Sequence, residues 1–372
     1  MTMKRLVWLD VAKGLAILVV VYFHFFRTYF EHGPLPAADW TTFGTGLMTL
    51  LGLAWIKVSN LGFHAVGVFI ILSGWALMQS TLRKAEKANL SWLEWYRARF
   101  FRLYPMYWVA HLVYLVSPFT ARFEKIDGRF VLSLLGLRFI DITNTFYYLN
   151  SAWWYFTMLI QLYLLFPLLF AAARRLGPGR YLLIACGVGL LVRYLLLVVY
   201  QVNGMWIQGG LALCRLPEFA LGMALAMWDQ RVPKQLERFL LGGPAFITGV
   251  VLYPAALLLY ANLTTYVFVD IATSTCCCLV LLGLAGMIAR TGYLAKAIAL
   301  VGIYSYGLYL VHQPYVIWLG LRIREEPVWS FLLIAIVTLI VLSLWGMFLE
   351  KATNTLVNLL TRHKPKPALS LQ

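Results

Sequence analysis

Long apolar stretches separated by short polar segments recur along almost the whole chain. Each stretch holds roughly 20 mostly apolar residues, the length that an α-helix needs to cross the hydrocarbon core of a bilayer. The pattern predicts an all-α integral membrane protein, a bundle of about ten transmembrane helices. The expected spans are 8–30, 61–80, 104–120, 153–172, 181–200, 209–228, 240–260, 268–289, 297–320 and 328–349.

Two of the segments between the predicted spans are long, at about 31–60 and 121–152. Each contains an apolar piece, 44–56 and 130–140, that is too short to cross a bilayer. We expect these pieces to form short re-entrant or interfacial helices in the outer loops. The first span is longer than the apolar region of a signal peptide, so we expect it to remain in the mature protein.

Composition agrees with a membrane protein, because 62% of the residues are hydrophobic and only 12% are charged. The net charge of +16 does not indicate a nucleic-acid partner, since Lys and Arg are concentrated in the short loops between spans. Most of them fall on the side of the N-terminus, which predicts that both termini are cytoplasmic. The five cysteines lie within apolar spans and are interpreted as packing residues, so no metal site is expected. Residues 1–361 are predicted to form a single transmembrane domain, followed by a cytoplasmic tail at 362–372.

The first span carries a polar face. Asp10, Lys13 and His24 fall within an arc of roughly 60° of an α-helix, and Lys13 lies about 16 Å from His24 along the axis. Charged groups at membrane depth usually face a bundle interior or a watery cavity, so this face is predicted to line an internal channel. The alternative is an Asp10–Lys13 pair at one membrane surface and His24 at the other.

Six segments resemble, in order, the motifs of membrane acyltransferase family 3, which contains acyl-CoA-dependent glycan O-acyltransferases. The first, LDVAKG, is followed by His24 at the spacing that this family shows. The fourth, WWYFTMLIQLYLLFP at 153–167, departs from the family, because Met158, Leu159 and Ile160 stand where many members have a glutamate. The second and third segments are VGVFIILSGWAL (66–77) and RARFFRLYPMYW (97–108). The fifth and sixth are RLPEFALGM (215–223) and YSYGLYLVHQP (304–314).

This resemblance implies an acyl-CoA donor, with acetyl-CoA expected, and a hydroxyl acceptor on a glycan or a lipid-linked glycan. It implies no permanently bound cofactor. Arg99 and Arg102 share one helix face, and guanidinium groups match phosphate oxygens, so both are assigned to the CoA phosphates, with Lys13 deeper. The alternative for the arginines is ordinary anchoring at the cytoplasmic surface.

The catalytic candidates are His24 and Asp10. A neutral imidazole of His24 could remove the proton of an acceptor hydroxyl, or could itself carry the acyl group. The candidates for the acceptor site or the pore lining are His312, Arg215, Glu218, Trp154 and His64. Structural alternatives for these five are a helix-end histidine, an Arg215–Glu218 ion pair and an aromatic belt. The Ser73–Gly74 pair is interpreted as a place of close helix packing.

The sequence therefore predicts a multi-pass O-acyltransferase of a bacterial cytoplasmic (inner) membrane, whose acceptor is reached from the periplasmic side. A proton-coupled transporter or exporter of a polar solute is the alternative, because intramembrane His, Lys, Asp and Arg suit a proton path equally well. A sensor or scaffold without turnover would not explain the polar helix face. The Arg99–Arg102 pair favours the enzyme, and so does the lack of repeated halves.

Overall fold

The computed structural model describes residues 7–31, 55, 58–59, 61–117 and 126–362. Every regular element in these ranges is a helix. The long helices are α1 (Val7–Glu31), α4 (Leu61–Glu86), α5 (Trp92–Val116), α8 (Trp154–Leu176), α9 (Pro178–Tyr194), α10 (Leu216–Arg231), α12 (Gly243–Leu257), α14 (Val269–Ile288), α15 (Gly292–Ile303), α16 (Ser305–Arg322) and α17 (Val328–Arg362). The short ones are α6 (Gly128–Leu135), α7 (Ile142–Thr145), α11 (Pro233–Leu240) and α13 (Leu263–Tyr266), together with single turns of other helix types.

Within the described ranges, seven helices are long and apolar enough to cross a membrane, and the bent pair α15–α16 is a further candidate. The described part of the chain is thus all-helical, and the protein is a multi-pass membrane protein. Helix α5, which carries arginines, and α10, which has 16 residues, are not among these candidates. The full set of ten spans and the cytoplasmic placement of both termini therefore stay predictions.

Two predicted spans are wrong in form. The stretch 297–320 is not one straight helix, because α15 and α16 meet at Tyr304 at an angle of 77°. The stretch 209–228 does not start as an α-helix. It begins in a π-helical turn, Trp206–Gly210, continues in a 3₁₀ turn, Ala212–Arg215, and becomes α-helical only at α10. Pro217, in the first turn of α10, lacks a backbone N–H and so favours a helix start at this point.

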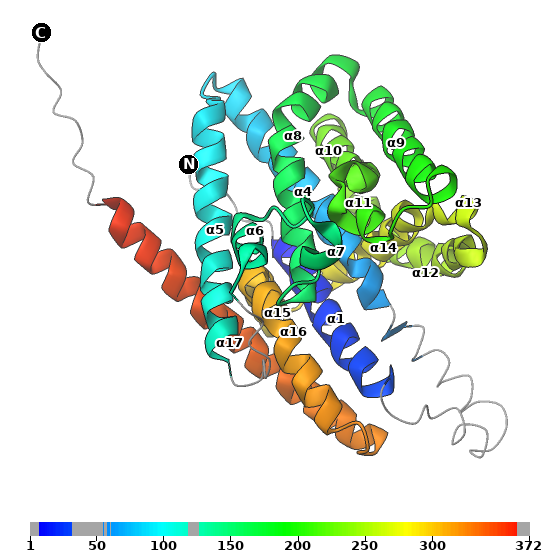
Figure 1. Cartoon of the computed structure of the whole chain (residues 1–372). Coiled ribbons are helices and arrows are strands. Elements are labelled where there is room, and N and C mark those ends of the chain that lie inside the picture. Colours follow the sequence, from blue (N-terminus) through cyan, green and yellow to red (C-terminus); the bar gives the residue numbers. More distant parts are fainter. Residues whose placement is uncertain (1–6, 32–54, 56–57, 60, 118–125, 363–372) are drawn as a thin grey trace, which may run out of the picture.

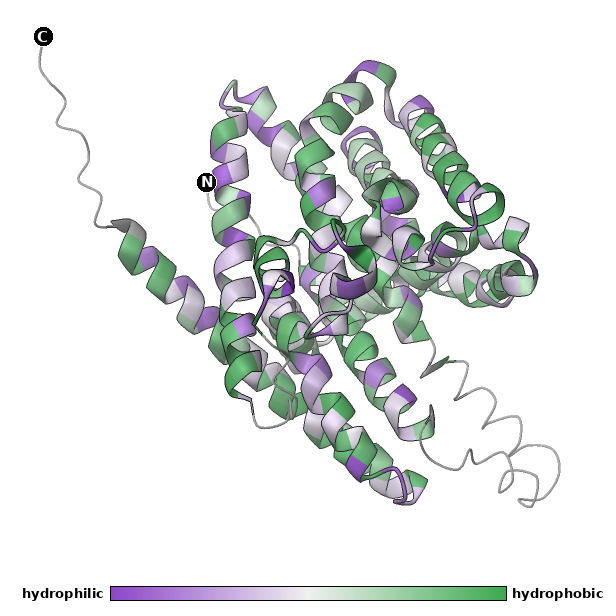
Figure 2. Ribbon diagram, in the orientation of Figure 1, coloured by the Kyte–Doolittle hydropathy of each residue, from purple (hydrophilic) through white to green (hydrophobic). Residues whose placement is uncertain are grey.

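Helices α1 and α4 form the centre of the bundle (Figure 1). The buried share of the most apolar stretch of each helix is 67% in α4 and 56% in α1, but only 22% in the span that contains α9. Helix α9 is mostly apolar and lies at the periphery, as Figure 2 shows. The peripheral helices therefore present apolar faces suited to lipid, and the polar residues of α1 lie in the interior.

Glycines let the central helices approach at backbone distance. A Cβ atom on Gly302 of α15 would lie 1.8 Å from the carbonyl oxygen of Asp10 in α1. A Cβ atom on Gly74 of α4 would lie 2.2 Å from the carbonyl oxygen of Phe219 in α10. Small residues of this kind are typical of helix contacts in membranes, and the packing role predicted for Gly74 is confirmed.

The outer segment that follows α5 contains the short helices predicted from its apolar piece at 130–140. Asp127 caps α6 by accepting a hydrogen bond from the backbone N–H of Arg129 at 2.9 Å. The next turn is held by Arg138, which is fully buried and donates to the carbonyl oxygens of Thr145, Phe146 and Tyr148. The other predicted piece, 44–56, and the tail at 362–372 lie almost entirely outside the described residues.

Candidate active site

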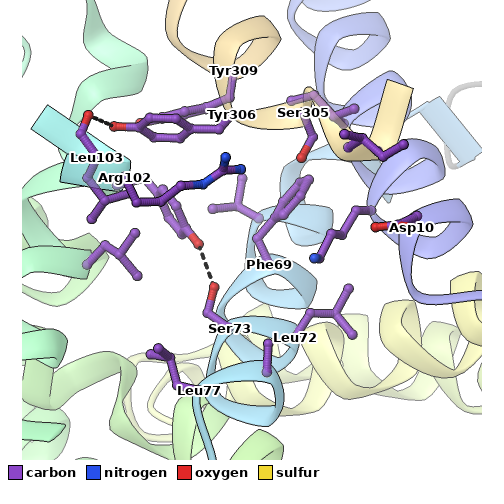
Figure 3. Close-up of a pocket in the computed structure, with 18 of the residues that line it drawn as sticks. Asp10, Phe69, Leu72, Ser73, Leu77, Arg102, Leu103, Ser305, Tyr306 and Tyr309 are labelled. Atoms are coloured by element: carbon purple, nitrogen blue, oxygen red, sulfur yellow. Dashed lines mark hydrogen bonds between the residues drawn. The ribbon is translucent and has the colours of Figure 1, made fainter. Parts of the chain in front are cut away.

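The first of two cavities along α1, the inner cavity, has a volume of about 670 Å³ (Figure 3). We call it inner because the residues of α1 that line it lie in the first half of this helix, on the side predicted to be cytoplasmic. Its polar wall contains Asp10, Lys13, Arg99 and Arg102, from α1 and α5. Further lining residues include Ser73 and Ser80 of α4, Tyr155 and Tyr163 of α8, and Ser305, Tyr306 and Tyr309 of α16.

The two arginines are held differently. The Nη2 atom of Arg99 donates to the hydroxyl of Ser80 at 3.4 Å, and its guanidinium lies 4.9 Å from the centre of the Trp95 ring. Arg102 lies 3.2 Å from a carboxylate oxygen of Glu350, and its side chain remains 51% exposed. In Figure 3, Arg102 extends into the cavity beside Tyr306. Both arginines line the cavity, and their predicted role toward the phosphates of CoA stays a prediction.

The second cavity, the outer cavity, has a volume of about 350 Å³ and lies further along α1. It contains four of the sequence candidates, namely His24, His64, Trp154 and Arg215. Its other polar and aromatic lining residues are Phe23, Phe63, Tyr147, Asn203, Gln208, Tyr266, Asp270 and Ser274. Val66 of α4 lines both cavities, so they are neighbours. The predicted polar face of α1 thus borders two adjoining cavities, with Asp10 and Lys13 in one and His24 in the other.

His24, which lines the outer cavity, lies beside His312 of α16. Their ring centres are 5.3 Å apart, although 288 residues separate them in sequence. The Nδ1 atom of His312 lies 2.7 Å from the carbonyl oxygen of Tyr309, which can only accept, so Nδ1 carries the proton. The Nε2 atom of His312 is then an acceptor, and it is buried without a hydrogen-bond partner in the described part of the chain. Tyr309 itself lines the inner cavity.

A buried ionic network borders the outer cavity. Arg215 lies 3.0 Å from Glu218 and 2.7 Å from Asp270, which is also 2.5 Å from Arg193. The network gives Arg193, a buried residue in the last turn of the apolar helix α9, a carboxylate neighbour. The Arg215–Glu218 ion pair is present, and Arg215 additionally lines the cavity.

His64 and Trp154 both line the outer cavity, but their rings make different contacts. Both ring nitrogens of His64 are engaged, one 2.6 Å from the hydroxyl of Tyr253 and the other 2.9 Å from that of Tyr260. Trp154 instead packs its ring against the backbone of Gly209, where a Cβ atom would lie 2.6 Å from the indole. His64 is therefore a fixed structural ring, whereas Trp154 presents an aromatic surface.

The sequence candidates did not include several residues that line the two cavities or contact their walls. Asp270 is the only acid in α14, and an acid within an apolar span is a functional signal that could have identified it. Glu350 lies just beyond the last predicted span, so its burial was not evident. The tyrosines of the inner cavity lie in two of the family-like segments but were not among the site candidates, because aromatic residues are also expected at membrane surfaces. They are Tyr155, Tyr163, Tyr306 and Tyr309.

The fold and these cavities define a class: a multi-pass helical membrane protein with a buried polar site. A family model described as an acyltransferase domain matches residues 6–347, nearly the whole chain. The chain therefore belongs to membrane acyltransferase family 3, and it is a membrane acyltransferase. It is 26% identical over 288 residues to Acyltransferase MdmB of Streptomyces mycarofaciens, and the aligned region covers 70% of each chain. No solved structure matches it.

Proposed function

We propose that the protein transfers an acetyl or other short acyl group from cytoplasmic acyl-CoA to a hydroxyl of a glycan or lipid-linked glycan. The acceptor enters from the periplasmic side of a bacterial inner membrane. The single observation that carries this proposal is the His24–His312 pair. His24 lines the polar, aromatic outer cavity, and His312 contacts Tyr309, which lines the neighbouring basic inner cavity. Donor and acceptor would meet at this pair.

The inner cavity suits the donor. Arg99 and Arg102 at its mouth can form charge-assisted hydrogen bonds with the phosphates of CoA. The pantetheine arm is slim and uncharged, and a cavity of about 670 Å³ can hold it while the nucleotide stays at the mouth. Lys13 lies about 16 Å from His24 along α1, which is comparable with the length of the extended arm. The thioester would thus reach the histidine pair.

The outer cavity suits a sugar. Trp154 offers an aromatic surface for a sugar ring, and Asn203 and Gln208 offer amide groups for its hydroxyls. Asp10 takes no part in the proton transfer, because it lies about 21 Å from His24 along the helix. We assign Asp10 to the donor end of the site, beside Lys13.

The reaction then needs one base. The imidazole of His24 removes the proton of the acceptor hydroxyl, and the oxygen attacks the thioester carbonyl. The carbon–sulfur bond breaks as the carbon–oxygen bond is completed, and the imidazolium returns the proton to the leaving thiolate. A route in which His24 carries the acyl group uses the same residues in two steps. His312, whose ring is fixed by the carbonyl of Tyr309, helps to orient the acceptor.

The donor assignment is tested by the binding of radiolabelled acetyl-CoA to the purified protein in lipid nanodiscs. Replacing both Arg99 and Arg102 by alanine should raise the dissociation constant at least about tenfold, because two charge-assisted contacts are lost. Arg97→Ala is the matched control, since Arg97 lies on the same helix but does not line the cavity. Unchanged affinity in the double variant, or no acetyl-CoA binding by the wild type, would overturn the assignment.

A further inference from the structure

Glu350 of α17 is a buried acid that joins three helices at the inner cavity. One of its carboxylate oxygens lies 3.2 Å from Nη2 of Arg102 in α5. The other accepts a hydrogen bond from the backbone N–H of Gly307 in α16 at 2.8 Å. Glu350 is only 2% exposed, whereas the side chain of Arg102 is 51% exposed and lines the inner cavity. The carboxylate is therefore fixed by buried contacts, while its partner Arg102 lines the cavity that the donor would occupy.

The surrounding backbone leaves this carboxylate little freedom. A Cβ atom on Gly307 would lie 2.5 Å from the carbonyl oxygen of Gly346, so α16 and α17 touch at backbone distance beside Glu350. Gly307 lies in the first turn of α16, where unpaired N–H groups favour a negative charge. Burial of a carboxylate is costly unless it is paired and hydrogen-bonded, and both conditions are met.

The same point fixes the wall of the inner cavity. Tyr306, next to Gly307, donates its hydroxyl to the carbonyl oxygen of Leu103 at 2.9 Å, and Leu103 follows Arg102 in α5 (Figure 3). Ser305 and Tyr306 line the cavity from the first turn of α16. Glu350 thus links the guanidinium of Arg102 to the break between α15 and α16.

We propose that Glu350 is a positioning residue, which orients the guanidinium of Arg102 for a phosphate of the acyl-CoA donor. This inference rests on the proposed donor role of Arg102. One edge of the guanidinium pairs with Glu350, and the remaining N–H groups of its planar fork are directed to the ligand. Without the carboxylate, the long arginine side chain has no fixed orientation and must be ordered again on binding.

The test is a double-mutant cycle on the binding of acetyl-CoA to the full-length protein in nanodiscs. Glu350→Gln should raise the dissociation constant about five- to tenfold in the wild type, and should have no further effect in an Arg102→Ala background. The turnover number at saturating acetyl-CoA should stay within about twofold, because Glu350 does not touch the reacting atoms. Glu94→Gln, an exposed acid on α5 that does not line the cavity, is the control.

Each outcome has one meaning. Equal effects of Glu350→Gln in both backgrounds, or a lower dissociation constant caused by removal of a competing anion, would overturn the positioning role. If Arg102→Ala itself leaves the affinity unchanged, the donor site of the proposed function fails instead. Should Glu350→Gln not yield folded protein, Glu350→Asp retains the charge on a shorter side chain. It should still raise the dissociation constant, and an unchanged value would contradict the proposal.

Discussion

At the scale of single residues, Asp270 balances the charge of the network beside the outer cavity. Its Oδ2 atom is shared by Arg193 and Arg215, and Arg193 donates further hydrogen bonds to the carbonyl oxygens of Val267 and Tyr266. Arg215 has Glu218 as a second carboxylate, whereas the carboxylate partner of Arg193 is Asp270. Asp270 is therefore the member of the network whose loss of charge should destabilise the fold most.

Replacing Asp270 by asparagine should lower the thermal stability of the purified protein. The change leaves Arg193 buried without a carboxylate, and breaking a buried pair in this way typically costs about 3–5 kcal/mol. Melting in detergent, followed by tryptophan fluorescence, would measure it. Glu325→Gln is the control, because the Arg324–Glu325 pair is exposed and its contacting atoms are 3.7 Å apart, so little change is expected. An Asp270→Asn variant as stable as the wild type would show that the network does not hold the helices together.

At the scale of helices, the contact between α1 and α15 places the polar face of α1. Gly302 allows α15 to lie against the carbonyl of Asp10, and Gly14 faces the carbonyl of Ile298 in the same way, with a Cβ distance of 2.2 Å. Side chains at these positions would separate the two helices and displace Asp10 and Lys13 from the cavity wall.

A Gly302→Leu substitution should therefore weaken acetyl-CoA binding and lower the melting temperature together. Gly292→Leu is a matched control in the same helix, because no atom lies within 4 Å of the position of its Cβ. Binding and melting of both variants would be compared in detergent. Similar behaviour of the two would mean that the close contact between α1 and α15 is not required for the donor site.

Much of the helix arrangement could be predicted from the apolar pattern, but helix breaks could not. The sequence across Tyr304 is as apolar as a continuous span and does not indicate the 77° bend, after which α16 packs against both α1 and α17. The spacing of Asp10, Lys13 and His24 predicted a shared face, because helical periodicity is local. The pairing of His24 with His312, and of Arg102 with Glu350, depends on contacts between distant segments and has no local signal.

At the scale of the whole molecule, the two cavities lie one beyond the other along the central helix α1. Helix α17, with 35 residues, is about 52 Å long, which exceeds the roughly 30 Å of a hydrocarbon core. Its C-terminal part extends beyond the neighbouring helices in Figure 1. The distance of about 16 Å between Lys13 and His24 along α1 is close to half of the same core, so a donor entering from one side would reach the middle of the membrane.

In the proposed reaction, the acyl group of a thioester in the inner cavity is transferred at the imidazole of His24. The most direct measurement is the single-turnover rate of acetyl transfer from labelled acetyl-CoA to glycan extracted from the host membrane, with wild-type protein and His24→Ala in parallel. We expect the variant to bind acetyl-CoA with a dissociation constant within about twofold of the wild-type value, but to transfer the acetyl group at least about 100-fold more slowly. Transfer by His24→Ala at a nearly normal rate would contradict the proposed reaction.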